Sequence, residues 1–205
     1  MEVKTSTRRT QAERTAATRS TLLASARKLF ATKGFGEVST QEIVAEAGVT
    51  RGALYHQFAD KTELFAAVYE EVEAQLVAEI AGLMSADLPT DPVAAMRLGV
   101  RAFLDRCSEP DVERIVLVDA PAVLGWDRWR QIGARYGLGA IEAMLGQAVE
   151  AGAIPAQPLR PTAHILLGAL DEAALYISRA DDPVRAREDM YAVCDRIFRG
   201  LAAPD

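Results

Sequence analysis

The stretch VTRGALYHQF, residues 49–58, carries side chains suited to hydrogen-bond an anion or the edge of a base. If the stretch is helical, Arg51 and Tyr55 share one face, and Gly52 and His56 form the neighbouring row. A guanidinium can bond phosphate or the acceptor pair of guanine, while Tyr and His can donate to phosphate oxygens. The spacing therefore favours a surface that contacts nucleic acid. Taken alone, His56 is also consistent with a surface or core-edge side chain.

Catalytic chemistry has little support elsewhere in the chain. The two histidines, His56 and His164, have no neighbouring Cys, His or Asp at metal-ligand spacing. The sequence contains no Walker loop, dinucleotide-binding glycine pattern or nucleophile elbow. Cys107 and Cys194 have no visible activating partner, and both lie in helical patterns typical of buried cytosolic thiols. We therefore expect a protein that is not an enzyme, with no catalytic residue, metal or cofactor.

Helices are predicted to precede the stretch. Apolar residues recur at helical spacing over residues 22–30, and Gly34 supplies a C-terminal stop. Ser39 and Glu42 have the spacing of a capping box, which begins a short second helix. Gly48 ends this second helix, because a glycine readily adopts the positive φ that lets the chain leave a helix.

The stretch itself is predicted to be the third helix of the chain. Thr50 can cap it, and Leu54 and Phe58 form its core-facing side. Asp60 then begins a long helix that runs to about residue 80. Two short helices joined by a glycine-containing turn are typical of a helix–turn–helix, whose second helix lies in the DNA major groove.

The remainder of the chain has further helix starts, each marked by a proline, at residues 92, 110, 121, 161 and 183. We expect an all-α protein with about nine helices. The predicted divisions are a flexible basic arm over residues 1–15, a helix–turn–helix domain over 16–80 with the motif at 39–58, and a helical body over 81–205.

Charge is distributed unevenly along the chain. Residues 1–61 hold ten Lys or Arg and six Asp or Glu, a net charge of +4, although the whole chain has a net charge of −6. The rest of the chain has a net charge of −10. A basic front on an acidic body indicates that one end contacts a polyanion. A basic disordered tail alone does not account for this, because Arg27, Lys28, Arg51 and Lys61 lie in patterned segments.

Together these residues form one extended pattern. It reads Leu22-Leu23-x-x-Ala26-x-x-Leu29-Phe30-x-x-x-Gly34-Phe35, then Ser39-Thr40-x-x-Ile43-x-x-x-Ala47-Gly48-Val49, then Thr50-Arg51-Gly52-Ala53-Leu54-Tyr55-x-x-Phe58-x-x-Lys61-x-x-Leu64. Over roughly residues 18–78 the chain resembles the TetR family of one-component transcriptional regulators. It departs from the usual pattern at Gln57, a less common residue there, which leaves the contact role of Gln57 open.

The resemblance implies a double-stranded DNA operator of roughly palindromic sequence. We expect Arg51 to contact a base and Lys61 to contact phosphate. The expected DNA-binding residues are Thr40, Gln41, Thr50, Arg51, Gly52, Tyr55, His56 and Lys61.

The resemblance also implies a homodimer, through the last two helices at about residues 161–201, and a small-molecule effector that releases a repressor from DNA. Apolar residues on these two helices could instead close the core of one protomer. The expected effector-binding residues are Phe103, Trp126, Trp129, Met144, His164 and Tyr176, although residues of these types in such positions are more often ordinary core or interface residues.

Two further expectations concern location and the alternative function. The chain has no apolar run long enough to span a membrane, and no apolar stretch follows the basic amino terminus, so we expect a cytoplasmic protein. The alternative function is an all-helical interaction or adaptor protein without sequence-specific DNA binding. Such a protein needs neither the basic front nor the Arg51–Gly52 surface.

Overall fold

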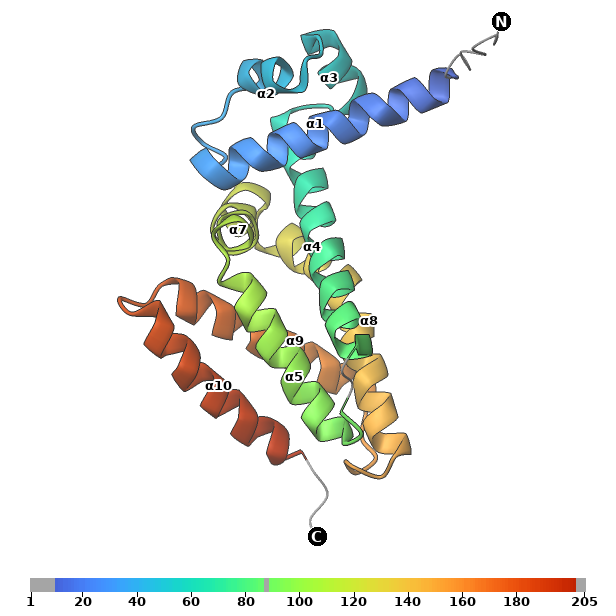
Figure 1. Ribbon diagram of the computed structural model, residues 1–205, viewed down its shortest axis with the longest axis vertical. Coiled ribbons are helices and arrows are strands. Elements are labelled where there is room, and N and C mark those ends of the chain that lie inside the picture. The colour runs from blue at the N-terminus through green and yellow to red at the C-terminus, as the bar shows by residue number, and fades with distance from the viewer. Residues whose placement is uncertain (1–9, 87–88, 202–205) are drawn as a thin grey trace, which may run out of the picture. The chain divides into compact units, whose positions relative to one another are not determined.

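The computed structural model describes residues 10–86 and 89–201, and these residues form helices and no strand (Figure 1). The helices are α1 (Gln11–Lys33), α2 (Thr40–Ala47), α3 (Arg51–Gln57), α4 (Lys61–Ala86), α5 (Pro92–Cys107), α6 (Pro110–Val112), the π-helix η1 (Glu113–Asp119), α7 (Ala120–Leu124), α8 (Trp126–Glu150), α9 (Leu159–Ser178) and α10 (Pro183–Arg199). Because α6, η1 and α7 follow one another without a break, the described residues contain nine continuous helical stretches, as predicted.

The contacts within the chain divide it into two units, and the division falls inside α4 between Val68 and Tyr69. The sequence predicts a boundary near residue 80, because apolar residues recur at helical spacing as far as Ile80. In the structure, the fully buried Leu64 and Phe65 belong to the first unit, and the buried Leu76 belongs to the second.

The core of the first unit is built from α1, α2, α3 and the first turns of α4 (Figure 1). The rings of Phe30, Phe35 and Phe65 contact one another, with centroids 5.2–5.7 Å apart. Ile43 from α2 and Leu54 from α3 are fully buried against this core. Burial of these side chains fixes the orientation of the short α2 and α3, which are too short to be stable alone.

The first helix begins earlier than predicted. The Thr10 side chain accepts a hydrogen bond from the Glu13 backbone N–H, and the Glu13 carboxylate accepts one from the Thr10 N–H. This capping box starts α1 at Gln11, so residues 11–15 are helical and do not belong to the expected arm. Residues 1–9 of that arm lie outside the described residues.

In the second unit, α8 packs against α9, and α10 lies against α5 and α9 (Figure 1). Asp91 and Asp182 accept hydrogen bonds from backbone N–H groups in the first turns of α5 and α10. Pro92 and Pro183 stand at the first positions of these helices, as predicted. Pro121 differs from them, because it lies inside the continuous helical stretch 110–124.

Candidate nucleic-acid interface and internal cavity

The third helix has the two faces predicted from the sequence. Leu54 is fully buried and Phe58, just after the helix, is also buried. The opposite side is solvent-exposed and consists of Arg51, Gly52, Tyr55 and His56. Thr50 caps the helix, since its hydroxyl oxygen accepts from the Ala53 N–H at 3.2 Å. The core thus holds α3 from one side and leaves a continuous polar face on the other.

Of the two glycines in this region, only one is required by the conformation of the backbone. Gly48 ends α2 in the left-handed conformation, with φ of 64°, which L side chains rarely adopt. Gly52 lies within α3 and has no such constraint. A Cβ built at Gly52 would contact the Thr50 hydroxyl oxygen at 3.8 Å, an ordinary contact, and nothing else within 4 Å. The fold of the protein therefore does not require glycine at position 52.

Arg51 and Tyr55 are linked on the exposed face. The Arg51 guanidinium donates to the Tyr55 hydroxyl at 3.5 Å and lies 5.5 Å from the centre of its ring. The hydrogen bond from Arg51 is the largest cause that lowers the pKa of Tyr55, and a hydrogen bond with the Thr40 side chain lowers it further. Thr40, at the start of α2, is thus brought next to α3. These contacts arrange a set of donors and acceptors on one surface.

Lys61 has a different environment from the one the sequence suggests. Its ammonium donates to the backbone carbonyls of Phe35 and Val38 at 2.8 and 2.9 Å and lies 4.0 Å from the centre of the Phe35 ring. These contacts hold the segment between α1 and α2 against the start of α4. The ammonium has a third N–H besides these two, so the expected phosphate contact by Lys61 stays a prediction.

Gln57, whose role the sequence leaves open, lies between α3 and α1. Its side-chain amide donates to the Thr15 backbone carbonyl at 3.5 Å. The backbone carbonyl of Gln57 accepts from the Arg19 guanidinium, also at 3.5 Å. The Arg19 guanidinium also lies 4.4 Å from the centre of the Phe58 ring. Gln57 and Arg19 therefore attach α3 to α1. Gln41, by contrast, is exposed near the start of α2.

An internal cavity of about 340 Å³ lies within the second unit, lined by residues of α4, η1, α5, α8, α9 and α10. Of the six predicted effector residues, Phe103 and Met144 line it. Trp126, His164 and Tyr176 are exposed and lie outside it.

Trp129 also lies outside the lining, although it is buried. Its indole N–H donates to the Val116 carbonyl, so its buried position has a structural reason. The sequence shows which residues are aromatic but not which of them face a shared hollow, because that depends on how six elements pack.

The polar wall of this cavity was not predicted. Glu73 is buried, and burial raises its pKa to about 7. Asp171 is ion-paired with Arg130, yet burial raises its pKa to about 6. A sequence signal for Glu73 did exist: it stands beside Val72 and three residues before Leu76, in the apolar stripe of α4.

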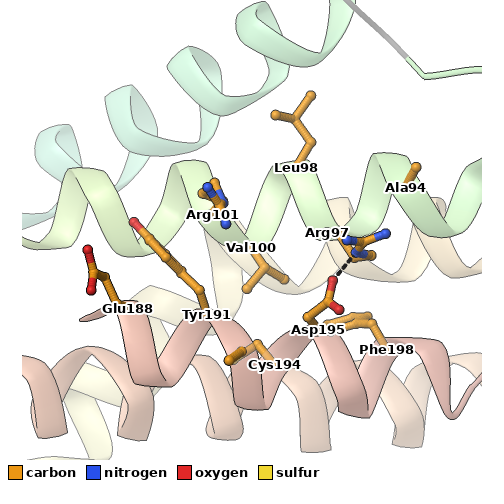
Figure 2. Close-up of a pocket in the computed structure, with 11 residues that line it drawn as sticks. Ala94, Arg97, Leu98, Val100, Arg101, Glu188, Tyr191, Cys194, Asp195 and Phe198 are labelled. Carbon is orange, nitrogen blue, oxygen red and sulfur yellow. Dashed lines mark ion pairs between the residues drawn. The ribbon is translucent and has the colours of Figure 1, made fainter. Parts of the chain in front are cut away.

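A second hollow, of about 750 Å³, lies between α5 and α10 (Figure 2). Two of its charged residues are paired with each other, and a third contacts an aromatic ring. Arg97 forms an ion pair with Asp195, and the Arg101 guanidinium lies 4.5 Å from the centre of the Tyr191 ring. The Tyr191 hydroxyl in turn donates to Asp105. These contacts join α10 to α5, and none of the predicted site residues lines the hollow.

Residues 10–86 and 89–201 lack two other kinds of functional feature. No group of three or more His, Cys, Asp or Glu side chains there is arranged to hold a metal ion. No helix in that part of the chain combines the length and apolar character of a membrane span. Cys107 and Cys194 are buried and unpaired, which confirms the prediction of free thiols.

Comparison with known proteins connects both units to one family. Residues 22–68 match the family model of bacterial regulatory proteins of the tetR family, and residues 93–201 match that of the tetracyclin repressor-like C-terminal domain. The chain is 27% identical to the transposon Tn10 TetC protein of Escherichia coli over 191 residues, 93% of each chain. It is 39% identical to the HTH-type transcriptional regulator AcrR of Shigella flexneri over 80 residues, 39% of this chain and 37% of AcrR.

A solved structure extends this similarity over nearly the whole chain. The crystal structure of a TetR-family transcriptional regulator from Pectobacterium atrosepticum is 33% identical to it, with a TM-score of 0.84. The match covers 96% of this chain and 99% of that one. Family models, sequence identity and fold therefore agree, and the chain belongs to the TetR family of bacterial transcriptional regulators.

Proposed function

We propose that this regulator is a repressor that binds a roughly palindromic operator as a homodimer and is released when a small molecule occupies the cavity of its second unit. TetR-family regulators bind DNA operators and small molecules and act as dimers, and they are generally not enzymes. A repressor of this kind acts in the cytoplasm, where bacterial DNA lies.

The exposed face of α3 is the observation that carries the DNA-binding proposal. Arg51 is the side chain that can bond a guanine through two hydrogen bonds, and Tyr55 and His56 can donate to phosphate. Gly52 lies between them although the protein has room for a larger residue. A close approach of the α3 backbone to DNA gives this glycine a reason that the fold alone does not.

Three further polar residues extend this proposed contact surface. Thr40 and Gln41 stand at the start of α2, where free backbone N–H groups favour a phosphate. Thr50 caps α3 through its hydroxyl oxygen and retains an O–H to donate. We place phosphate contacts at these residues, and Lys61, whose ammonium donates to two carbonyls within the unit, keeps a third N–H for the same role.

Exposed apolar residues on the last two helices support the proposed dimer. Ile165 and Tyr176 are 73% and 56% exposed on α9, eleven residues apart, which is close to three full helical turns. Val193 and Ile197, one turn apart on α10, are also exposed. The apolar face of α9 that could otherwise serve the interface is buried within the protomer, and it consists of Leu166, Leu167, Leu170, Ala173, Ala174 and Ile177.

The long helix α4 provides a physical route from effector to DNA. Glu73, Leu76 and Ile80 of this helix line the cavity, while Leu64 and Phe65 lie in the core of the first unit. A ligand that prefers one position of α4 therefore changes the spacing of the two DNA-binding units of a dimer. Such a ligand shifts operator affinity only by its difference in affinity for the two positions.

The proposal is tested by selecting genomic fragments on the immobilised protein and measuring affinity for the selected duplex and for a scrambled one. The expected result is a preference for a palindrome, with affinity that falls steeply as salt rises. Arg51→Ala should reduce that preference while Arg135→Ala, the same charge change at an exposed side chain of α8 outside the proposed dimer region, leaves it intact. Equal affinity for all fragments would refute the proposal.

A further inference from the structure

The cavity of the second unit is apolar apart from three polar side chains. Glu73, Asp171 and the amide of Gln147 contribute to its lining, which contains no Lys, Arg or His side chain. Asp171 is ion-paired with Arg130, which lies outside the lining. Glu73 is only 7% exposed and forms no ion pair with any described residue. The cavity thus contains one carboxyl group without a cation.

Glycines keep this carboxyl group accessible from the cavity. A Cβ at Gly133 of α8 would lie 3.5 Å from the Tyr69 hydroxyl and 3.9 Å from a Glu73 carboxylate oxygen. A Cβ at Gly137, one turn later, would lie 3.4 Å from a Leu167 methyl. Both glycines line the cavity, so the absence of a side chain leaves space beside Glu73 at Gly133 and beside Leu167 at Gly137.

Another part of the cavity lining is apolar and adaptable. Met84, Met96 and Met144 line it together with Phe103. A Cβ at Gly99 would contact the side chains of Met144 and Met84 at 3.5 Å. Methionine side chains adjust to irregular apolar shapes. A volume of about 340 Å³ is at the small end of the range for ligand sites, which indicates a compact ligand.

We propose that the effector is a compact apolar molecule with one protonated amine, and that its ammonium group forms an ion pair with Glu73. This assignment rests on the proposed function of the cavity as the effector site. The apolar body of the ligand contacts the methionines and Phe103, while its ammonium group supplies the positive charge that Glu73 has no other partner for. An anionic ligand is disfavoured because it would lie against two carboxyl groups and no base.

The surroundings of Glu73 predict that binding depends on pH. The groups around it are the Tyr69 hydroxyl on its own helix, the Asp171–Arg130 pair from α9 and α8, and the Cys107 thiol from α5. Burial raises the pKa of Glu73 to about 7, so the empty site is partly protonated near neutral pH. An ammonium ligand requires the carboxylate, and its affinity should therefore rise with pH and level off above about pH 7.

The test compares ligands that share a body and differ in the polar group. Calorimetric titration of the full-length protein, without DNA, would use two sets of ligands. The first is 1-adamantylammonium, 1-adamantanol and adamantane-1-carboxylate, and the second is 2-naphthylmethylammonium, 2-naphthylmethanol and 2-naphthoate. At least one ammonium should bind tenfold or more tightly than its alcohol, and neither carboxylate should bind. Failure of both ammonium ligands to bind, or equal or tighter binding of an alcohol or carboxylate, would overturn the assignment.

Variants and pH then test the role of Glu73. Glu73→Gln should weaken ammonium binding by roughly 10- to 100-fold and leave alcohol binding unchanged. Glu70→Gln, one turn earlier on α4 and outside the cavity lining, should leave both unchanged. If Glu73→Gln does not fold, the wild-type protein decides the matter, since affinity for the ammonium must fall as pH falls from about 8 to 6. Ammonium binding that is independent of pH, or unaffected by Glu73→Gln, would overturn the proposal.

The outcome is separable from that of the proposed function. Titration without DNA measures the ligand class, whereas release of the selected duplex by the same ammonium measures regulation. Tight ammonium binding without release of DNA would support the ligand class and contradict the proposed release mechanism.

Discussion

The indole N–H of Trp129 donates to the backbone carbonyl of Val116 at 3.0 Å. Val116 lies in the π-helix η1, where a carbonyl accepts from the N–H five residues later, as Ile115 does from Ala120. Five residues after Val116 stands Pro121, which has no N–H to donate. Trp129 therefore supplies from α8 the hydrogen bond that the π-helix cannot make for itself.

Replacing Trp129 by Phe should destabilise the second unit. The Val116 carbonyl would lose its donor, and an unsatisfied buried polar group costs about 1–3 kcal/mol. Urea unfolding of the variant measures this loss. Trp126→Phe is the matched control, because Trp126 is 61% exposed and the change should stay within about 0.5 kcal/mol. Equal effects of the two substitutions would contradict the structural role of the Trp129 indole.

Trp129 also illustrates which parts of the structure the sequence could predict. Local signals were sufficient for the helices: the Ser39–Glu42 capping box, the Gly48 stop and the two faces of α3 all appear as predicted. Such features depend on residues a few positions apart. Whether Trp129 contacts a ligand or a distant carbonyl depends on the packing of α8 against η1, which periodicity does not encode.

The surroundings of Lys61 are not encoded by local pattern either. The sequence places a basic residue at the start of a helix next to a DNA-binding motif, and phosphate is the expected partner. The carbonyls of Phe35 and Val38, more than twenty residues earlier, are brought to the ammonium by the tertiary fold. Glu73 shows the reverse case, since it interrupts an apolar stripe and its burial could have been inferred from position alone.

Lys61→Met should therefore lower the stability of the first unit. Two backbone carbonyls lose a charged donor, for which a loss of about 1–3 kcal/mol is expected. Thermal unfolding followed by circular dichroism measures it. Lys28→Met removes the same charge from an exposed ion pair with Glu46 and should change stability by less than about 1 kcal/mol. If Lys61→Met is as stable as Lys28→Met but binds every duplex more weakly, the main role of Lys61 is a phosphate contact.

Gly52→Ala should have opposite effects on stability and on DNA binding. The free protein has space for the methyl group, and alanine favours a helix, so stability should rise by about 0.4–1 kcal/mol. Operator affinity should fall, because the added methyl separates the α3 backbone from DNA. Gly82→Ala, at an exposed position of α4 with nothing within 4 Å of a Cβ, should stabilise without changing operator affinity. Undiminished operator affinity in Gly52→Ala would rule out close backbone approach at this residue.

The stability of the second unit should depend on pH through Glu73. Burial raises its folded-state pKa from 4.5 to about 7, so the folded protein holds this proton more tightly than the unfolded chain does. The resulting stabilisation is complete below about pH 4.5 and is lost as pH rises through about 7. Glutamine cannot lose that proton. Glu73→Gln should thus match the wild type near pH 5 and exceed its stability by about 2–3 kcal/mol near pH 8.

Urea unfolding of both proteins across this pH range measures the difference, in which the titration of groups distant from Glu73 cancels. The nearby Asp171 is present in both proteins, and its partner Arg130 is not replaced. Glu70→Gln removes a carboxylate from a partly exposed pair with Arg135 and should give a small gap that does not widen with pH. A gap for Glu73→Gln that is constant from pH 5 to 8 would mean that Glu73 remains ionised in the folded protein, since only a proton gained on folding makes the gap grow as pH rises.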